Sequence, residues 1–200
     1  MAITNGYATL AVLKARLDIA AATTTYDSIL ENVIEAVSRW IDHWTGRRFY
    51  AVTETRYFSA EWPTMLEIDD LLSVTSLKTD KDGDRVYEDT WAATDYDREP
   101  LNASLDAQPY TRLRVTPNGQ FTFPAVRKGV EIAGSWGYAA TTPDQVNEAC
   151  LIQSSRVYQR KDAPFGIAGA PEIGQTAVIP RLDPDVKMLL DAFQRVRING

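Results

Sequence analysis

The sequence predicts an α+β protein with a mainly helical core of about four helices and a central antiparallel β insert. Apolar residues recur with helical spacing over residues 26–44, and polar and apolar residues alternate in several stretches between 51 and 140. Helix-start signals then return at residues 142 and 183. We therefore expect four segments, which are an N-terminal helical part at 1–50, an acidic β-rich insert at 51–140, a third core helix at 141–163, and a flexible arm with a C-terminal helix at 164–200.

The first two helices have clear boundary signals. Thr9 is a suitable N-cap for a short helix over residues 10–17. In the second, apolar residues keep the i, i+3, i+4, i+7 spacing for five turns over residues 26–44. Thr45 and Gly46 then end the pattern, because glycine readily adopts the left-handed conformation that closes a helix.

Proline marks the start of the two later helices. Thr142, Pro143 and Gln145 have the form of a capping box, which predicts a helix that continues to about residue 161. Asp183 and Pro184 predict the start of the last helix. The intervening residues 164–180 are rich in glycine and proline, which indicates a linker or mobile loop, and no Lys-Ser or Lys-Thr follows their glycines as a phosphate loop would require.

The insert shows strand patterns separated by turn signals. TETRYF and GVEIAGSW alternate in polarity, and SLKTDKDGDRVYED predicts two strands joined by a tight turn at Asp82 and Gly83. We expect residues 97–112 to form a long loop between strands.

Charge and composition exclude several classes of protein. The net charge is −6, and residues 51–140 carry all of it, with nine Lys and Arg against fifteen Asp and Glu. An acidic surface repels phosphate, which disfavours a general nucleic-acid binder. The single Cys150 permits no internal disulfide and suits a reducing compartment. We also expect neither a secretory signal nor a membrane span.

The residues that resemble catalytic or metal-binding groups are better interpreted as structural. Asp80, Asp82 and Asp84 are spaced like the start of a calcium loop, but the twelfth position is Trp91 and not glutamate, so a hairpin turn is favoured. Other candidates lack partners in the sequence: we expect a solvated strand end at Asp69-Asp70, a non-catalytic role for the single histidine, His43, and a small buried residue at Cys150. The sequence thus predicts no enzyme, no catalytic or metal-binding residue and no cofactor.

Arg47 and Arg48 follow the long helix directly and have two interpretations. Cations beyond a helix C-terminus complement the helix dipole, which is a purely local role. Alternatively, they form an intersubunit salt bridge with the acidic middle segment of a neighbouring copy. Two arginines alone are too few to predict a nucleic-acid site.

Four stretches together resemble the head-tail connector (adaptor) proteins of tailed bacteriophages. They are YATLAVLKARLDI, ILENVIEAVSRWIDHWTGRRF, VEIAGSWGYAATTPDQVNEACLIQSSRVYQRK and LDPDVKMLLDAFQRVR, and they cover both helical ends of the chain, while the middle matches in general style only. The resemblance implies a virion protein of the neck, assembled in the host cytoplasm. It would form a homo-oligomeric ring of about twelve subunits beneath the portal, and a monomer in isolation is compatible with it. The ring would extend the DNA channel without binding DNA specifically and would dock a stopper or tail-completion protein.

The resemblance also implies roles for individual residues. The C-terminal segment would reach the portal, with residues 164–180 as the reach and with contact residues Leu189, Leu190, Phe193, Arg195 and Arg197. Truncation after Ala163 would then leave a folded core that no longer binds portal. Asp80, Asp82 and Asp84 would border the channel, and Arg47 and Arg48 would contact a neighbouring subunit.

Three other functions are compatible with parts of the sequence. The first is a stopper or tail-completion protein lower in the neck, which the two-helix start argues against. A small hydrolase using carboxylates of the insert is opposed by the single histidine, and a DNA-binding packaging module is opposed by the acidic charge.

Overall fold

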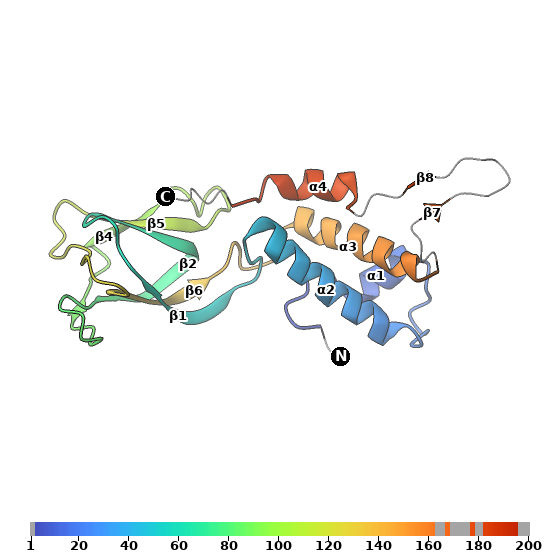
Figure 1. Ribbon diagram of the computed structural model, residues 1–200, viewed down its shortest axis with the longest axis horizontal. Coiled ribbons are helices and arrows are strands. Elements are labelled where there is room, and N and C mark those ends of the chain that lie inside the picture. The colour runs from blue at the N-terminus through green and yellow to red at the C-terminus, as the bar shows by residue number, and fades with distance from the viewer. Residues whose placement is uncertain (1–2, 163–166, 169–176, 179–181, 196–200) are drawn as a thin grey trace. The chain divides into compact units, whose positions relative to one another are not determined.

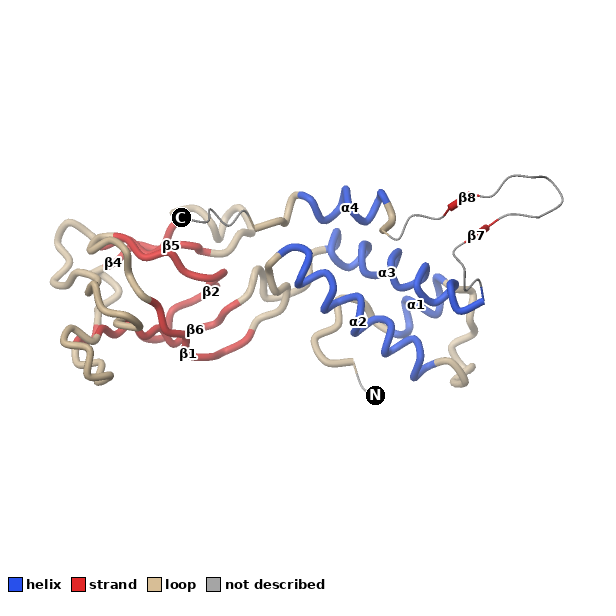
Figure 2. The backbone as a smooth tube through the Cα atoms, in the orientation of Figure 1, coloured by secondary structure: helices blue, strands red, loops and turns tan. Residues whose placement is uncertain are grey.

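The computed structural model describes residues 3–162, 167–168, 177–178 and 182–195, and it consists of two compact units. Met1–Arg47 and Thr142–Gly200 form one, here called the helical unit, and Arg48–Thr141 form the other, the sheet unit. Figures 1 and 2 show helices in the first and an antiparallel sheet in the second. The α+β fold class is therefore confirmed.

The helical unit contains all four expected helices. Their bounds are α1 Leu10–Arg16, α2 Asp27–Thr45, α3 Asp144–Gln159 and α4 Pro184–Asp191, and a 3-10 turn at Arg160–Asp162 continues α3. Two short strands, β7 at Ile167–Ala168 and β8 at Ala177–Val178, pair with each other. The rest of the predicted arm at 164–180 lies outside the described residues.

Three helix boundaries follow the predicted capping chemistry. The Thr9 hydroxyl accepts a hydrogen bond from the Val12 N–H at the start of α1. Gly46 closes α2 with a φ of 67°, in the left-handed region. Asp183 caps α4, where its carboxylate accepts the Asp185 N–H at 2.8 Å, and Pro184 is the first helical residue.

The predicted capping box at the start of α3 is wrong. Pro143 itself occupies the N-cap position, with an extended ψ of 146°, and makes no side-chain capping hydrogen bond. The helix therefore begins at Asp144, one residue later than expected, and the Asp144 carboxylate lies in the first turn beside the positive helix end.

The core of the helical unit lies where α3 packs against both α2 and α4, as Figure 1 shows. Each helix contributes fully buried apolar side chains, among them Leu13 of α1, Leu30, Ile34 and Ile41 of α2, Val146, Ala149 and Cys150 of α3, and Val186 and Leu190 of α4. The C-terminal helix is thus part of the core of this unit.

The sheet unit is a six-stranded antiparallel sheet. Its strands are β1 Val52–Phe58, β2 Met65–Thr79, β3 Asp89–Thr90, β4 Tyr96–Glu99, β5 Tyr110–Val115 and β6 Val130–Trp136. The order is β1-β6-β2-β5-β4, and β3 pairs with the end of β2. Consequently β1 and β4 are edge strands at the two ends of this order, and the short β3 forms a further edge beside the end of β2.

One face of this sheet carries a hydrophobic core that connecting segments cover. The indole of Trp91 stacks on Phe123 with ring centroids 4.7 Å apart, above buried strand residues such as Leu77 and Ile132. At Gly134 the strands β6 and β2 approach so closely that an added Cβ would lie 2.2 Å from the Ser73 carbonyl oxygen. Glycine is therefore required at this position of the sheet.

The two ends of the sheet unit lie side by side. The Tyr138 N–H donates to the Arg48 carbonyl at 2.7 Å, and the rings of Phe49 and Tyr138 have centroids 5.4 Å apart.

Two predictions within the insert need correction. The tight turn at Asp82 and Gly83 is part of a longer loop over residues 80–88, since the paired strand residues are only Lys78 with Thr90 and Thr79 with Asp89. The predicted loop at 97–112 includes strand residues of β4 and β5, which pair with each other on both sides of a shorter connection. Proline at position 100 interrupts the strand pattern in the sequence but follows the last paired residue of β4.

Across the described part of the chain, we find no helix with the length and apolar character that a membrane crossing requires.

Candidate functional site

The candidate catalytic residues do not come together. His43 is exposed on α2, whereas Cys150 is fully buried on α3. Burial raises the pKa of the Cys150 thiol, despite hydrogen bonds with the Ser38 and Ser154 hydroxyls at 3.6 and 3.9 Å that act in the opposite direction. Cys150 is therefore a small core residue and not an activated nucleophile.

Asp69 and Asp70 are not at a solvated strand end. Both lie in the middle of β2, at a bulge between Glu67 and Leu71 where the register with β5 shifts. The Asp69 carboxylate pairs with Arg56 at 3.0 Å, and Asp70 is buried. The prediction of a strand end is wrong because the strand continues past both residues through a β-bulge, which the sequence does not reveal.

The loop over residues 80–88, here called the acidic loop, is organised by aspartates. Asp80 is fully buried, and its carboxylate accepts the N–H groups of Gly83 at 2.7 Å and Arg85 at 3.0 Å. Although burial acts to raise the pKa of Asp80, these backbone hydrogen bonds bring it below its ordinary value. Asp82 and Asp84 are exposed, and each accepts a backbone N–H within the loop.

Oxygens of Asp80, Asp82 and Asp84 lie within 4.8 Å of one another, a spacing at which carboxylates can hold a cation. Their hydrogen bonds to the backbone already account for this spacing, because they fold the loop around Asp80. The carboxylate of Asp80 thus has a structural role, while those of Asp82 and Asp84 face solvent.

Arg47 and Arg48 have different environments. The Arg47 Nε donates to the Phe193 carbonyl at 2.8 Å, so this side chain connects the end of α2 to the segment that follows α4. Nearby, the Arg195 N–H donates to the Thr45 carbonyl at 2.9 Å. Arg48 is about half exposed, with a guanidinium nitrogen 3.9 Å from Glu54. Of the two arginines, only Arg48 exposes enough of its side chain to contact a neighbouring subunit.

The predicted portal-contact residues are also divided. Leu190 and Phe193 are buried within the helical unit, while Leu189 and Arg195 are partly exposed. Arg197 lies outside the described residues. Met188, which the sequence analysis did not select, exposes 69% of its surface on the outer side of α4.

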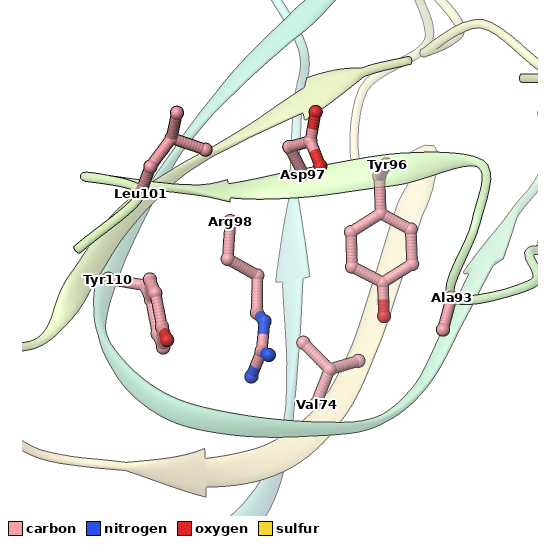
Figure 3. Close-up of a pocket in the computed structure, with 7 residues that line it drawn as sticks. All are labelled: Val74, Ala93, Tyr96, Asp97, Arg98, Leu101 and Tyr110. Carbon is pink, nitrogen blue, oxygen red and sulfur yellow. The ribbon is translucent and has the colours of Figure 1, made fainter. Parts of the chain in front are cut away.

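A pocket of about 350 Å³ lies beside edge strand β4 of the sheet unit, and Figure 3 shows its lining. We call it the β4 pocket, and it is lined by Val74, Ala93, Tyr96, Asp97, Arg98, Leu101 and Tyr110.

The side chain of Arg98 lies between the rings of Tyr96 and Tyr110, whereas Asp97 points away on the opposite face of β4 (Figure 3). The Arg98 guanidinium carbon lies 4.6 Å from the centroid of the Tyr110 ring, a cation–π contact. Burial raises the pKa of the Tyr96 hydroxyl, and the charge of Arg98 acts against this shift. Within the part of the chain that the structure describes, no carboxylate lies at ion-pair distance from Arg98.

Sequence reasoning missed this pocket because its residues come from three separate segments. The only local signal is the alternation in Tyr96-Asp97-Arg98-Glu99, which places two long side chains on one face of a strand.

Neither the family models nor the curated proteins searched include a match to this chain. Solved structures do match. The chain is similar to one from the neck of an empty gene transfer agent particle computed with C6 symmetry, at 18% identity and a TM-score of 0.62. It is also similar to chains from the virion of a native gene transfer agent particle, at 18% and 0.63, and from the neck of a native particle computed with C12 symmetry, at 18% and 0.60. Each match covers 100% of this chain and 95% of the other, and at this identity it establishes a common fold.

Proposed function

We propose that this protein is a structural component of the neck of a phage-like particle, where it acts as a head-tail connector (adaptor). The observation that carries the proposal is the likeness in fold to neck chains, which extends over the entire chain and nearly all of theirs. Two units of different architecture align together, which is a more specific match than a helical bundle or a sheet alone would give. The four sequence stretches that resemble adaptors support the same assignment.

In this role the chain forms a closed ring of about twelve copies beneath the portal. The similar neck structures were computed with C6 and C12 symmetry, which supports a ring of identical subunits. Such a ring requires two different surfaces on each subunit that fit one another, since only a heterologous contact repeats around a ring axis.

The portal contact is made by the outer face of α4. Leu190 and Phe193 contribute to the core of the helical unit, so the apolar surface available to a partner is that of Met188 and the partly exposed Leu189. An amphipathic helix that is anchored on one side can place its other side in a groove of a partner. The opposite end of the ring docks a stopper or tail-completion protein.

Acidic residues of the sheet unit, including the exposed Asp82, border the DNA passage. Like charges keep DNA from adhering to the channel wall, so DNA passes without specific binding. The protein acts without catalysis, is assembled in the host cytoplasm and remains in the neck of the virion.

Imaging of mixtures with the cognate portal tests this function. Purified protein is mixed with portal rings and examined by electron microscopy, and a second ring stacked on the portal is expected. Met188→Asp places a charge in the proposed contact and should abolish stacking, while Lys187→Ala, on the neighbouring exposed position, should not. Failure of the unmodified protein to stack at any concentration would contradict the adaptor assignment.

A further inference from the structure

We propose that adjacent subunits of the ring are joined through their sheet units, with the acidic loop of one subunit seated in the β4 pocket of the next. The inference rests on the proposed ring and identifies the partner of the pocket as a second copy of this chain. It assigns a cationic, partly apolar surface to the edge strand β4 and an acidic, partly apolar surface to the connection between β2 and β3.

The pocket side has the composition of a binding surface. Leu101, which lines the pocket, exposes 69% of its surface, and Leu105, four residues later in the same connection, exposes 83%. Arg98 also lines the pocket, with its guanidinium against the Tyr110 ring. Stacking holds the planar guanidinium in place and leaves its N–H groups available for an incoming carboxylate.

The acidic loop presents the complementary set. Val86 exposes 57% of its surface, and it is flanked by the exposed carboxylates of Asp84 and Glu88. Residues 80–88 hold four acidic against two basic side chains. A Val86 side chain fits beside Leu101, and one neighbouring carboxylate can pair with Arg98.

The acidic loop is also fixed by contacts within its own subunit. Few of its side chains therefore lose freedom when it binds a neighbouring subunit. The Tyr87 hydroxyl donates to the Lys128 carbonyl at 2.8 Å, and the Tyr87 ring lies 5.7 Å from the ring of Tyr57 on β1. Arg85 donates to the Arg127 carbonyl. A preorganised loop loses less conformational entropy on association than a flexible one.

The two surfaces lie at different places on the sheet unit, because the acidic loop joins the end of β2 to β3. The β4 pocket belongs to edge strand β4, and the acidic loop contacts edge strand β1 through Tyr57. A subunit with two different and complementary surfaces associates head to tail, which is the type of contact that generates rings.

The chemistry argues for a carboxylate and against phosphate. Arg98 is the one cation among the residues that line the pocket, so the lining matches the single charge of a carboxylate. A doubly charged phosphate would retain one uncompensated charge there, and the exposed Leu101 in the lining favours a ligand that also carries an aliphatic group.

Zero-length cross-linking tests the contact directly. Arg98→Lys keeps the positive charge and supplies an amine, which a carbodiimide couples to a carboxylate only on direct approach. The variant is prepared in unlabelled and ¹⁵N-labelled forms, mixed, and cross-linked under conditions in which rings form, alone or on portal. We expect peptides in which position 98 of one isotope is joined to Asp82, Asp84 or Glu88 of the other. Links from position 98 only within one subunit, or only to portal, would overturn the proposal.

Charge exchange provides the second test. Arg98→Glu should abolish ring formation, as should Asp84→Lys combined with Glu88→Lys, and the triple variant should recover rings because the charges are complementary again. Mixing the two defective proteins should also restore rings, with the two variants in alternation, because each pocket then meets a loop of opposite charge. Arg112→Glu, an exposed arginine on β5, is the matched control and should form rings normally. Circular dichroism verifies that each variant is folded.

The outcomes separate this inference from the proposed function. If rings of the unmodified protein form but Arg98→Glu leaves them unchanged, the interface is wrong and the adaptor assignment is unaffected. If no ring forms alone or on portal, both are wrong.

Discussion

Removing one buried side chain from α4 should destabilise the helical unit. Leu190 is fully buried against α3, so Leu190→Ala leaves a cavity in a core to which all four helices contribute. Buried Leu→Ala substitutions typically cost about 2–5 kcal/mol. A cost of about 3 kcal/mol is a large part of the roughly 5–15 kcal/mol that stabilises an ordinary domain. In a domain of about 100 residues it lowers the melting temperature by roughly 10–20 °C.

The assay is urea or thermal unfolding followed at 222 nm, where helix dominates the circular dichroism signal. The matched control is Met188→Ala, two residues earlier in α4 and 69% exposed, which should change stability by less than about 0.5 kcal/mol. The same reasoning applies to truncation after Ala163, which removes α4 completely. We now expect that truncation to unfold the helical unit, so loss of portal binding by it would not identify a binding segment.

Equal stability of Leu190→Ala and the unmodified protein would refute this reasoning, because it would mean that α4 does not pack as described. Equal destabilisation by both alanine variants would also refute it, since the exposed and buried faces of the helix would then be indistinguishable.

Three further predictions concern the remaining sites. Arg47→Ala removes the hydrogen bond to a main-chain carbonyl after α4 and should cost about 1–2 kcal/mol in urea unfolding, whereas Arg48→Ala should cost less than about 0.5. Asp80→Asn should lower stability at neutral pH. Because the folded-state pKa of Asp80 is below its ordinary value of 3.8, the difference in stability from the unmodified protein should disappear as the pH falls through that lowered pKa. A constant difference down to strongly acidic pH would contradict this prediction. Gly134→Ala should prevent pairing of β2 with β6 and abolish the near-ultraviolet signal of the sheet unit, and a native spectrum would contradict the close approach seen there.

Local signals in the sequence predicted most of the helical unit. Thr9, Gly46 and Asp183 act through neighbours within three or four residues, so their roles follow from the sequence alone. The start of α3 shows the limit of such rules, because Thr142, Pro143 and Gln145 match a capping box that the folded chain does not form, and the helix begins one residue later.

The candidate sites were less predictable because they depend on long-range contacts. The position of Asp70 is set by a bulge between distant strands, and Arg47 meets a carbonyl 146 residues away. Arg98 gains its environment from Tyr110 across a loop and from Val74 on another strand. The sequence reveals the charge of each of these residues but not which of them share a surface.

The adjacent ends of the sheet unit have an evolutionary consequence. The Arg48 carbonyl and the Tyr138 N–H are joined by a 2.7 Å hydrogen bond, so the chain leaves this unit close to where it enters. A segment of this kind behaves as an inserted module: it can be gained, lost or exchanged for another through two nearby junctions, with little demand on the host fold. Proteins that share this fold can therefore keep one helical framework while the inserted module diverges.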